Sequence, residues 1–247
     1  MLGGVTWMPT GEIHASPAHP GASRLSPIDL NVTTLSESCL IDGPADAPAS
    51  VLLAHGAGAP MDSPFMQTIA TGLAQQGWRV LRFEFPYMAQ QRLSGGRRAP
   101  DRMPRLLHHF REQVALAAAG GPLLIGGKSL GGRVASLVVD ELAAASTVCG
   151  CVCLGYPFHP PGKPDQLRTQ HLQALQTPTL ILQGERDSFG RRDEVERYSL
   201  SPLVNLEWIS AGDHSFKPTR SSGLTEADNL ARAVVLCDAF LKRQLLR

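Results

Sequence analysis

The residue with the clearest chemical potential is Ser129, at the centre of the stretch Gly-Lys-Ser-Leu-Gly over 127–131. This G-x-S-x-G match follows an apolar run at 122–127 and precedes a helix-forming run that starts at Leu130. A serine on a tight strand-to-helix turn is lifted clear of the sheet, and the amides of the new helix point towards the reacting oxygen. We therefore interpret Ser129 as a candidate nucleophile; the alternative is a glycine-rich turn without chemistry.

The same turn also matches the end of a phosphate-binding loop, because Gly127, Lys128 and Ser129 fit the last three positions of G-x-x-x-x-G-K-S. That motif requires a glycine where this chain has Pro122. Residues 123–125 also belong to the expected strand, which leaves no loop to wrap a phosphate. The sequence therefore argues against nucleotide binding at this turn.

A serine hydroxyl needs a base to take its proton, and three histidines lie downstream of the candidate nucleophile. His214 follows an expected strand at 203–210, at the sheet edge where parallel sheets bind ligands, so we interpret it as the base. His171 falls in an expected helix and is predicted to lie at the surface. His159, in the loop Tyr-Pro-Phe-His-Pro-Pro, is predicted to overhang the pocket and contact the substrate.

The acid that orients the base is expected between the serine and the histidine in chain order. Asp187 lies in the loop after an expected strand at 178–184, and Glu185, nearer the strand end, is the alternative. Asp213 is adjacent to His214, and neighbouring side chains rarely meet in the required geometry, so a turn or capping role is favoured for it. A carboxylate at Asp187 would fix the imidazole tautomer and stabilise the imidazolium.

Two backbone N–H donors are needed to stabilise an oxyanion. The first candidate is the amide of Leu130, directly after the nucleophile. The second is the amide of Ala57, in the sequence His-Gly-Ala-Gly-Ala-Pro at 55–60, where small side chains let the backbone approach a ligand. His55 is expected to be structural, with its ring tied to nearby backbone.

Apolar runs alternate with amphipathic stretches along most of the chain. Strands are expected at 50–55, 78–85, 122–127, 148–155, 178–184 and 203–210, and helices at 64–76, 101–119, 130–145, 166–176, 191–198 and 224–245. Two short strands are expected earlier, at 28–32 and 38–41, and a loop rich in Gly, Arg and Pro at 90–100. This rhythm predicts an α/β fold with a mostly parallel sheet and helices on both faces. We expect an irregular arm over 1–27 and a single domain over 28–247.

The composition of the 247 residues is that of a globular protein, with 43% hydrophobic and 18% charged residues. The net charge of +1 gives no electrostatic case for nucleic acid or membrane binding. The start of the chain lacks the basic and apolar regions of a signal peptide, and no run approaches the about 18 apolar residues of a membrane span. A soluble, cytoplasmic protein is therefore expected.

Three of the five cysteines, Cys149, Cys151 and Cys153, alternate along an expected strand. Residues two apart on a strand point the same way with Cβ atoms about 6.5–7 Å apart, too far for a disulfide. We interpret these cysteines as small apolar side chains in a buried strand, a pattern that suits a reducing compartment, rather than as metal ligands. Neither a metal nor an organic cofactor is expected.

Six segments together resemble the α/β-hydrolase superfamily. They are LLAHGAGAPMDSPFM, LRFEFPYM, GGKSLGGRVAS, LGYPFHPPGKP, LILQGERDSFG and GDHSFKP, which run from about residue 50 to 218. Within the superfamily they are similar to the small members like dienelactone hydrolase, and most to bacterial predicted hydrolases related to the testis-expressed hydrolase-like proteins. The resemblance implies the α/β-hydrolase fold with an intact triad at Ser129, Asp187 and His214. Since only 155–177 separate two expected strands, no large cap domain is expected.

Two functions of different classes follow from these observations. The first is hydrolysis of a small ester, thioester or related acyl bond through a covalent acyl-enzyme, with a small-molecule acyl substrate. The second is a non-catalytic interaction protein that keeps the hydrolase fold without using its site. An intact triad favours the enzyme, and the sequence defines no oligomeric state.

A cluster of arginines in a glycine-rich loop could hold an anion. Its members are Arg92, Arg97, Arg98, Arg102 and Arg105. A solvated loop without a ligand is the favoured interpretation.

Overall fold

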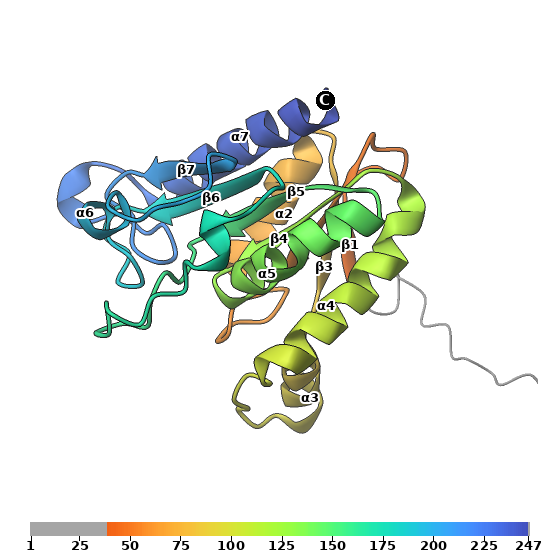
Figure 1. The fold of residues 1–247 in the computed structure, drawn as a ribbon, viewed down its shortest axis with the longest axis horizontal. Coiled ribbons are helices and arrows are strands. Elements are labelled where there is room, and N and C mark those ends of the chain that lie inside the picture. The colour runs from red at the N-terminus through yellow and green to blue at the C-terminus, as the bar shows by residue number, and fades with distance from the viewer. Residues whose placement is uncertain (1–38, 247) are drawn as a thin grey trace, which may run out of the picture. The chain divides into compact units, whose positions relative to one another are not determined.

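The computed structural model describes residues 39–246, which contain a seven-stranded sheet in the order β1-β3-β2-β4-β5-β6-β7 (Figure 1). The strands are β1 (Cys39–Asp42), β2 (Ser50–Ala54), β3 (Arg79–Phe83), β4 (Leu123–Lys128), β5 (Val148–Leu154), β6 (Thr179–Gly184) and β7 (Val204–Ile209). Only β1 pairs antiparallel, with β3, and the other pairings are parallel. The predicted α/β class is confirmed. The expected arm over 1–27 and strand at 28–32 lie outside the described residues, so the predicted domain division stays a prediction.

Helices cover both faces of this sheet. They are α2 (Pro64–Gln75), α3 (Pro86–Ser94), α4 (Met103–Ala117), α5 (Leu130–Ala145), α6 (Arg192–Val195) and α7 (Glu226–Leu245), with short 3₁₀ turns η1 (Ala118–Gly120), η2 (His171–Gln173) and η3 (Arg220–Ser222). One face packs against α4 and α5, and the other against α2 and α7. Parallel strands need such crossover connections, which explains why both faces are covered.

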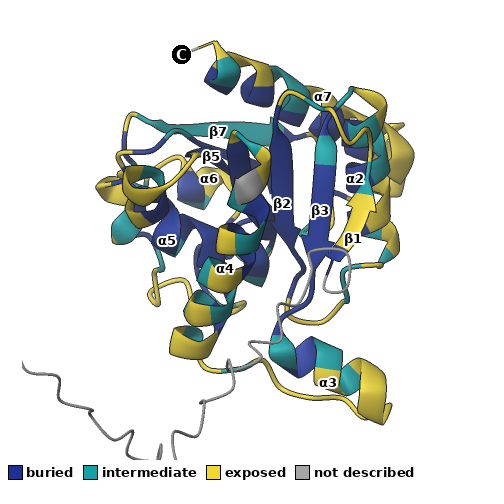
Figure 2. Cartoon of the chain, turned by 90° about the vertical axis from the view of Figure 1, so that its right-hand side faces the viewer, coloured by how far each residue is buried: buried dark blue, intermediate teal, exposed yellow. Residues whose placement is uncertain are grey.

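Strand β2 illustrates how the sequence determines these layers. All five of its residues are buried, as Figure 2 shows, because the two faces of the strand lie against different helices. Leu52 contributes to the core beneath α4 and α5, whereas Val51 and Leu53 contribute to the core beneath α2 and α7. A continuous apolar run is therefore required here, in place of the alternation of a half-exposed strand.

The loop expected at 90–100 is wrong in its first half, because α3 extends through Ser94. Pro86 lies in the first turn of this helix, where its missing N–H costs nothing, and Gly95 ends it with a φ of 70°. Proline at the start and glycine just past the end are typical helix signals, and sequence analysis made no use of them here. Figure 2 shows α3 buried or half-buried near its start, where Tyr87 and Met88 lie, and exposed towards its end.

The helix expected at 166–176 is also wrong, since the structure forms only the 3₁₀ turn η2 there. The amide of Arg168 donates to the carbonyl of Phe158 at 2.8 Å, and Thr169 and Leu172 are buried. These tertiary contacts fix an irregular course that local helix propensity cannot overcome. The segment between β5 and β6 thus forms no large cap.

The helix expected at 191–198 is reduced to the single turn α6, Arg192–Val195.

The five cysteines all carry free thiols, and Cys151 and Cys153 are buried on β5 as expected. Among residues 39–246, no helix is both long and apolar enough to cross a membrane.

Four loops that carry predicted site residues follow the carboxyl ends of strands. Strand β2 leads into the loop that contains Ala57, and β4 leads directly into Ser129. Strands β6 and β7 lead into the loops of Asp187 and His214. Because β2, β4, β6 and β7 are parallel members of one sheet, these loops emerge at the same edge.

Candidate active site

Ser129 occupies a one-residue turn between β4 and α5. Its backbone has φ 50° and ψ −109°, one of few positive φ values at non-glycine residues in the described region. Such strain persists only when the surroundings enforce it. Here a Cβ atom on Gly127 or on Gly131 would overlap the carbonyl oxygen of Ala54, so the turn can pack this closely only with glycine at both positions.

Ser129, His214 and Asp187 form one continuous hydrogen-bonded chain. The Oγ atom of Ser129 lies 2.8 Å from Nε2 of His214, and Nδ1 of the same ring lies 2.7 Å from Oδ2 of Asp187. A carboxylate can only accept, so Nδ1 carries the ring proton and Nε2 is free to accept the serine hydroxyl proton. The structure thus brings together the three side chains that the sequence pointed to.

Asp187 is completely buried and held by two further donors. The side-chain amide of Gln183 donates to Oδ2 at 2.9 Å, and the backbone amide of Phe189 donates to Oδ1 at 2.8 Å. The Gln183 amide also reaches the carbonyl of Tyr156 at 3.2 Å. Sequence analysis missed Gln183, although a polar residue near the end of an otherwise apolar strand was a usable signal.

The surroundings of His214 keep its ring neutral. Burial lowers the pKa of His214, an effect that the hydrogen bond to Asp187 opposes and the nearby Lys128 ammonium reinforces. The ring of Phe189 lies against the imidazole, with 4.2 Å between ring centroids. A neutral imidazole with Nε2 facing a hydroxyl is the form that a general base requires.

Lys128 is a second residue that sequence analysis missed as part of the site. Its ammonium donates to the carbonyl oxygen of His214 at 2.5 Å and lies 5.3 Å from the centroid of the Phe65 ring. Burial lowers the pKa of Lys128 to about 8. The contact ties the end of β4 to the loop that carries His214, so Lys128 acts on the site through the position and charge state of that histidine.

A small cavity of about 260 Å³ lies beside Ser129. Its lining residues are Gly56, Ala57, Gly58, Ala59, Lys128, Ser129, Phe189, His214 and Ser215. The amide of Leu130 is the first of α5 and has no partner in the helix ladder. The hydroxyl of Tyr87 donates to the carbonyl of Ala57 at 3.1 Å, which fixes the loop that supplies the other predicted donor.

His55 has the structural role predicted for it. The amide of Phe85 donates to Nε2 of His55 at 3.1 Å, and Nδ1 lies 2.6 Å from the carbonyl oxygen of Gly56. Both ring nitrogens are therefore engaged with backbone. Burial lowers the pKa of His55, so the ring holds the loop after β2 as a neutral spacer.

The predicted substrate contact at His159 has no support in the structure. The residue is 3% exposed, and it is absent from the residues that line the cavity beside Ser129. Its Nδ1 lies 2.9 Å from the carbonyl of Pro160 and its Nε2 lies 3.2 Å from a carboxylate oxygen of Glu194. The Phe-His-Pro-Pro loop folds inwards, so His159 joins that loop to α6 and does not overhang the pocket.

His171 is not the surface residue that was expected. It is half-buried, and its Nε2 lies 2.9 Å from Oγ of Ser136.

The alternative acid, Glu185, pairs with Arg192 at 2.8 Å and accepts a hydrogen bond from the amide of Ala211.

Asp213 accepts the amides of Ser215 and Lys217, at 2.8 and 3.0 Å. This confirms the predicted turn role. The arrangement shapes the loop that presents His214.

Two of the five loop arginines already have carboxylate partners. Arg92 binds both Asp62, at 2.9 Å, and Glu84, at 2.6 Å, and Arg105 binds Asp101 at 3.0 Å. These pairs leave the loop with less free positive charge than its sequence indicates.

Between residues 39 and 246, no group of His, Cys, Asp or Glu side chains is arranged to hold a metal ion.

The fold and this geometry define the class of protein. A family model described as an alpha/beta hydrolase domain matches residues 47–242. Because the match covers most of the chain, the protein belongs to the alpha/beta hydrolase family. The predicted α/β-hydrolase fold is thereby confirmed.

Three solved structures are similar to this chain. A dienelactone hydrolase from Anabaena variabilis is 21% identical with a TM-score of 0.57, over 82% of this chain and 89% of that chain. An alpha-beta serine hydrolase homologue from Coxiella burnetii is 17% identical with a TM-score of 0.58, over 81% and 90%. A serine hydrolase without a lid from Xanthomonas campestris is 18% identical with a TM-score of 0.56, over 82% and 87%. At these identities the likeness shows the fold, in agreement with the dienelactone-hydrolase-like resemblance.

Proposed function

We propose that the protein is a serine hydrolase that cleaves a small ester, thioester or related acyl bond, with Ser129 as nucleophile, His214 as base and Asp187 as the orienting acid. The observation that carries the proposal is the unbroken chain of hydrogen bonds from the Ser129 hydroxyl through His214 to Asp187. Each of the three side chains comes from a different loop, and Ser129 has a strained backbone of the kind that clusters at functional sites.

The first chemical step is attack of the Ser129 oxygen on the acyl carbon. His214 takes the hydroxyl proton on Nε2 as the new C–O bond forms, and Asp187 stabilises the resulting imidazolium through its bond to Nδ1. The carbonyl oxygen becomes an oxyanion. The amides of Leu130 and Ala57 are the donors that we assign to it, because both border the serine and neither has a hydrogen-bonded acceptor among the described residues.

Collapse of the tetrahedral intermediate releases the alcohol or thiol, which takes its proton from His214, and leaves an acyl group on Ser129. A water molecule then attacks the acyl-enzyme after losing a proton to the same Nε2 atom. His214 returns this proton to the Ser129 oxygen as the acid leaves. One neutral imidazole therefore serves both halves of the reaction.

The dimensions of the site favour a small acyl group. The cavity of about 260 Å³ is bordered by the small side chains of 56–59, and the segment between β5 and β6 adds no large cap over it. A long acyl chain would extend beyond the lining residues into solvent and bury little of its surface. Short-chain esters or thioesters are therefore the substrates we expect.

Hydrolysis of a chain-length series of p-nitrophenyl esters tests this proposal. The wild-type protein should hydrolyse acetate and butyrate esters with a higher kcat/KM than long-chain esters. The Ser129→Ala variant should lose about 10⁴-fold or more in kcat for the same esters while it keeps its fold. A folded wild type without esterase activity on any ester or thioester would instead favour the non-catalytic interaction protein.

A further inference from the structure

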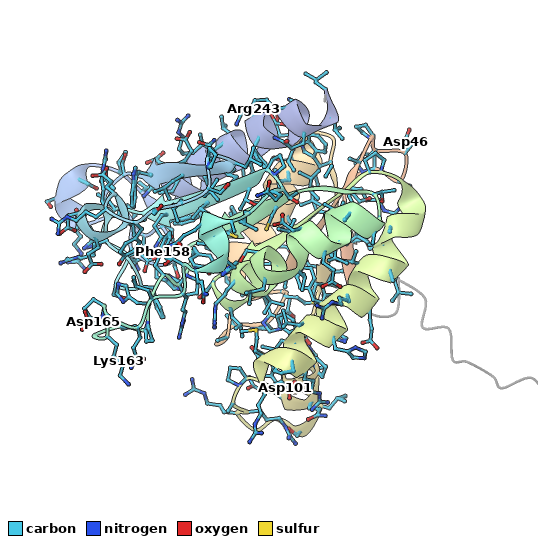
Figure 3. The ribbon with its side chains drawn as sticks, viewed as in Figure 1. Asp46, Asp101, Phe158, Lys163, Asp165 and Arg243 are labelled. Atoms are coloured by element: carbon cyan, nitrogen blue, oxygen red, sulfur yellow. The ribbon has the colours of Figure 1, made fainter. Side chains whose placement is uncertain are left out.

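A second pocket lies away from Ser129, between α5 and the segment that follows β5. It has a volume of about 440 Å³ and shares no lining residue with the cavity beside Ser129. Its lining residues are Arg133, Leu137, Leu167, Arg168, Gln170 and His171. Figure 3 shows the outer part of this segment, with Lys163 and Asp165, extending away from Phe158 at its base. The pocket therefore belongs to the inner part of the segment, where it returns to α5.

Arg133 and Arg168 bring two guanidinium groups to this pocket, whose lining residues include no acid. Within residues 39–246, neither side chain donates a hydrogen bond or forms an ion pair, and the Nε atom of Arg133 is buried without a partner. Burial lowers the pKa of Arg168, and the nearby charge of Arg133 lowers it further. By contrast, Arg82 and Arg111 each bind a carboxylate directly. Two close, partly desolvated, unpaired cations are costly unless an anion joins them.

A hydrogen-bond network holds the two arginine backbones in place. The hydroxyl of Ser136 donates to the carbonyl of Arg133 at 2.9 Å, and the hydroxyl of Tyr156 donates to the carbonyl of Arg168 at 2.8 Å. Both hydroxyl oxygens face Nε2 of His171, at 2.9 and 3.5 Å. Since each hydroxyl has already given its proton away, Nε2 of His171 is the donor to both. Ser136, Tyr156 and His171 therefore form a hydrogen-bonded frame that fixes the backbone of both arginines.

Arg133 and Asp140 both act on the ring of His171 through their charges. Burial, with help from Arg133, lowers the pKa of His171 to about 4, so its ring is neutral and adds no charge. Asp140 is within electrostatic reach of His171, but its carboxylate accepts the amides of Gln176 and Thr177 at 2.8–3.1 Å. Asp140 keeps its negative charge, but within residues 39–246 it forms no ion pair with Arg133 or Arg168, so the donor groups of both arginines stay free.

We propose that Arg133 and Arg168 form an anion-binding site, which takes the phosphate or carboxylate group of a small molecule into the pocket between α5 and the segment after β5. The planar donor forks of arginine suit both groups, and the partly desolvated pocket strengthens each charge-assisted bond. The apolar side chains of Leu137 and Leu167 border the same pocket, so the anion is best placed on an organic body. The site does not depend on the chemistry proposed for Ser129.

Calorimetric titration with inorganic phosphate, at constant ionic strength and neutral pH, tests the site. The wild type should bind one phosphate, and Arg133→Gln and Arg168→Gln should each weaken binding by about tenfold. Arg168→Lys should give an intermediate affinity, because it keeps the charge but loses the donor fork. Arg97→Gln, which removes an exposed arginine of the loop after α3, is the matched control and should bind like wild type.

Ser129→Ala separates this proposal from the proposed function. It should bind phosphate as wild type does, whatever its effect on ester hydrolysis. Loss of binding in Ser129→Ala would place the anion in the other cavity and overturn the proposal. So would wild-type affinity in a folded double variant of Arg133 and Arg168, or no saturable binding by the wild type.

Ester kinetics identify the source of the anion. If the group belongs to the substrate, Arg133→Gln should raise KM for a p-nitrophenyl ester with a free terminal carboxylate and leave the neutral butyrate ester unchanged. If the anion is a separate ligand, both esters should behave as in wild type although phosphate binding is weakened. Either result supports the site, provided that the titration shows the loss in the arginine variants.

Discussion

The serine–histidine pair at the start of α5 and the pair further along that helix have nearly the same separation. Ser129 lies 2.8 Å from the ring of His214, and Ser136 lies 2.9 Å from the ring of His171. Their surroundings differ in every other respect. Ser129 has a positive φ on a turn beside a cavity, whereas Ser136 is buried inside the helix.

The direction of the hydrogen bonds separates the two pairs chemically. In the first pair Asp187 fixes the ring proton on Nδ1, so Nε2 of His214 can accept from the serine. In the second pair Ser136 gives its proton to a backbone carbonyl and accepts from His171, and no carboxylate between residues 39 and 246 bonds to the other nitrogen of that ring. A short serine–histidine distance is therefore no sign of a nucleophile. What distinguishes Ser129 from Ser136 is the carboxylate bonded to the histidine, the ring tautomer that it fixes and the open space beside the serine hydroxyl.

After the loss of Ser129 itself, the largest predicted effect comes from removing Asp187, the acid bonded to His214. Asp187→Asn should lower kcat/KM for a short-chain ester by about 10³–10⁴-fold, because an amide can stabilise the wrong tautomer of His214. Glu185→Gln is the matched control, since this carboxylate binds Arg192 and a backbone amide instead. Initial-rate kinetics on both folded variants measure the effect. Equal losses in the two would contradict the role assigned to Asp187.

The turn that presents Ser129 should be intolerant of a single added methyl group. Gly131→Ala places a Cβ against the carbonyls of Ala54 and His55, and we expect a loss of about 1–3 kcal/mol in the free energy of unfolding. Gly58→Ala, in the facing loop, meets nothing within 4 Å and should leave stability unchanged. Urea unfolding curves compare the two variants. A stable, fully active Gly131→Ala protein would show that the turn is looser than described.

The second pair should matter for stability and not for catalysis. Ser136→Ala removes the nearer of the two acceptors for Nε2 of His171, so we expect about 1 kcal/mol of destabilisation in urea unfolding. Its kcat/KM for neutral esters should equal that of wild type. A large loss of activity in this folded variant would mean that the two pairs are coupled, against the contrast drawn between them.

The smallest predicted effect is a shift in pH dependence. The ammonium of Lys128 helps to lower the pKa of His214, so Lys128→Met should raise that pKa. Because the neutral imidazole is the active form, the acid limb of the kcat/KM profile should then move to higher pH. Lys217→Met removes an exposed, solvent-screened charge three residues from His214 and should leave the limb in place. A shift to lower pH in Lys128→Met would contradict this electrostatic role.

The sequence predicted Ser129, Asp187 and His214 because each of them lies in a recognisable local pattern. Ser129 lies in a motif with a required strand and helix around it, Asp187 follows the buried strand β6, and His214 follows the half-buried strand β7. The parallel order of β4, β6 and β7 then makes their convergence a consequence of topology. The length of the segment between β5 and β6 was enough to predict the absence of a large cap.

The parts that sequence analysis missed depend on contacts between distant segments. The inward turn of His159 follows from its bonds to Pro160 and Glu194, and no pattern in the Pro-rich loop indicates them. The pocket of Arg133 and Arg168 joins single residues 35 positions apart, each without a motif of its own. Helix α3 is different, because Pro86 and Gly95 marked its ends in the sequence.

Labelling with a fluorophosphonate probe, followed by peptide mapping, tests the central contrast most directly. We expect one adduct on the wild-type protein, located on Ser129, unchanged in Ser136→Ala and absent in Ser129→Ala. An adduct on Ser136, or labelling that persists in Ser129→Ala, would contradict this expectation, as would a folded wild type that takes up no probe.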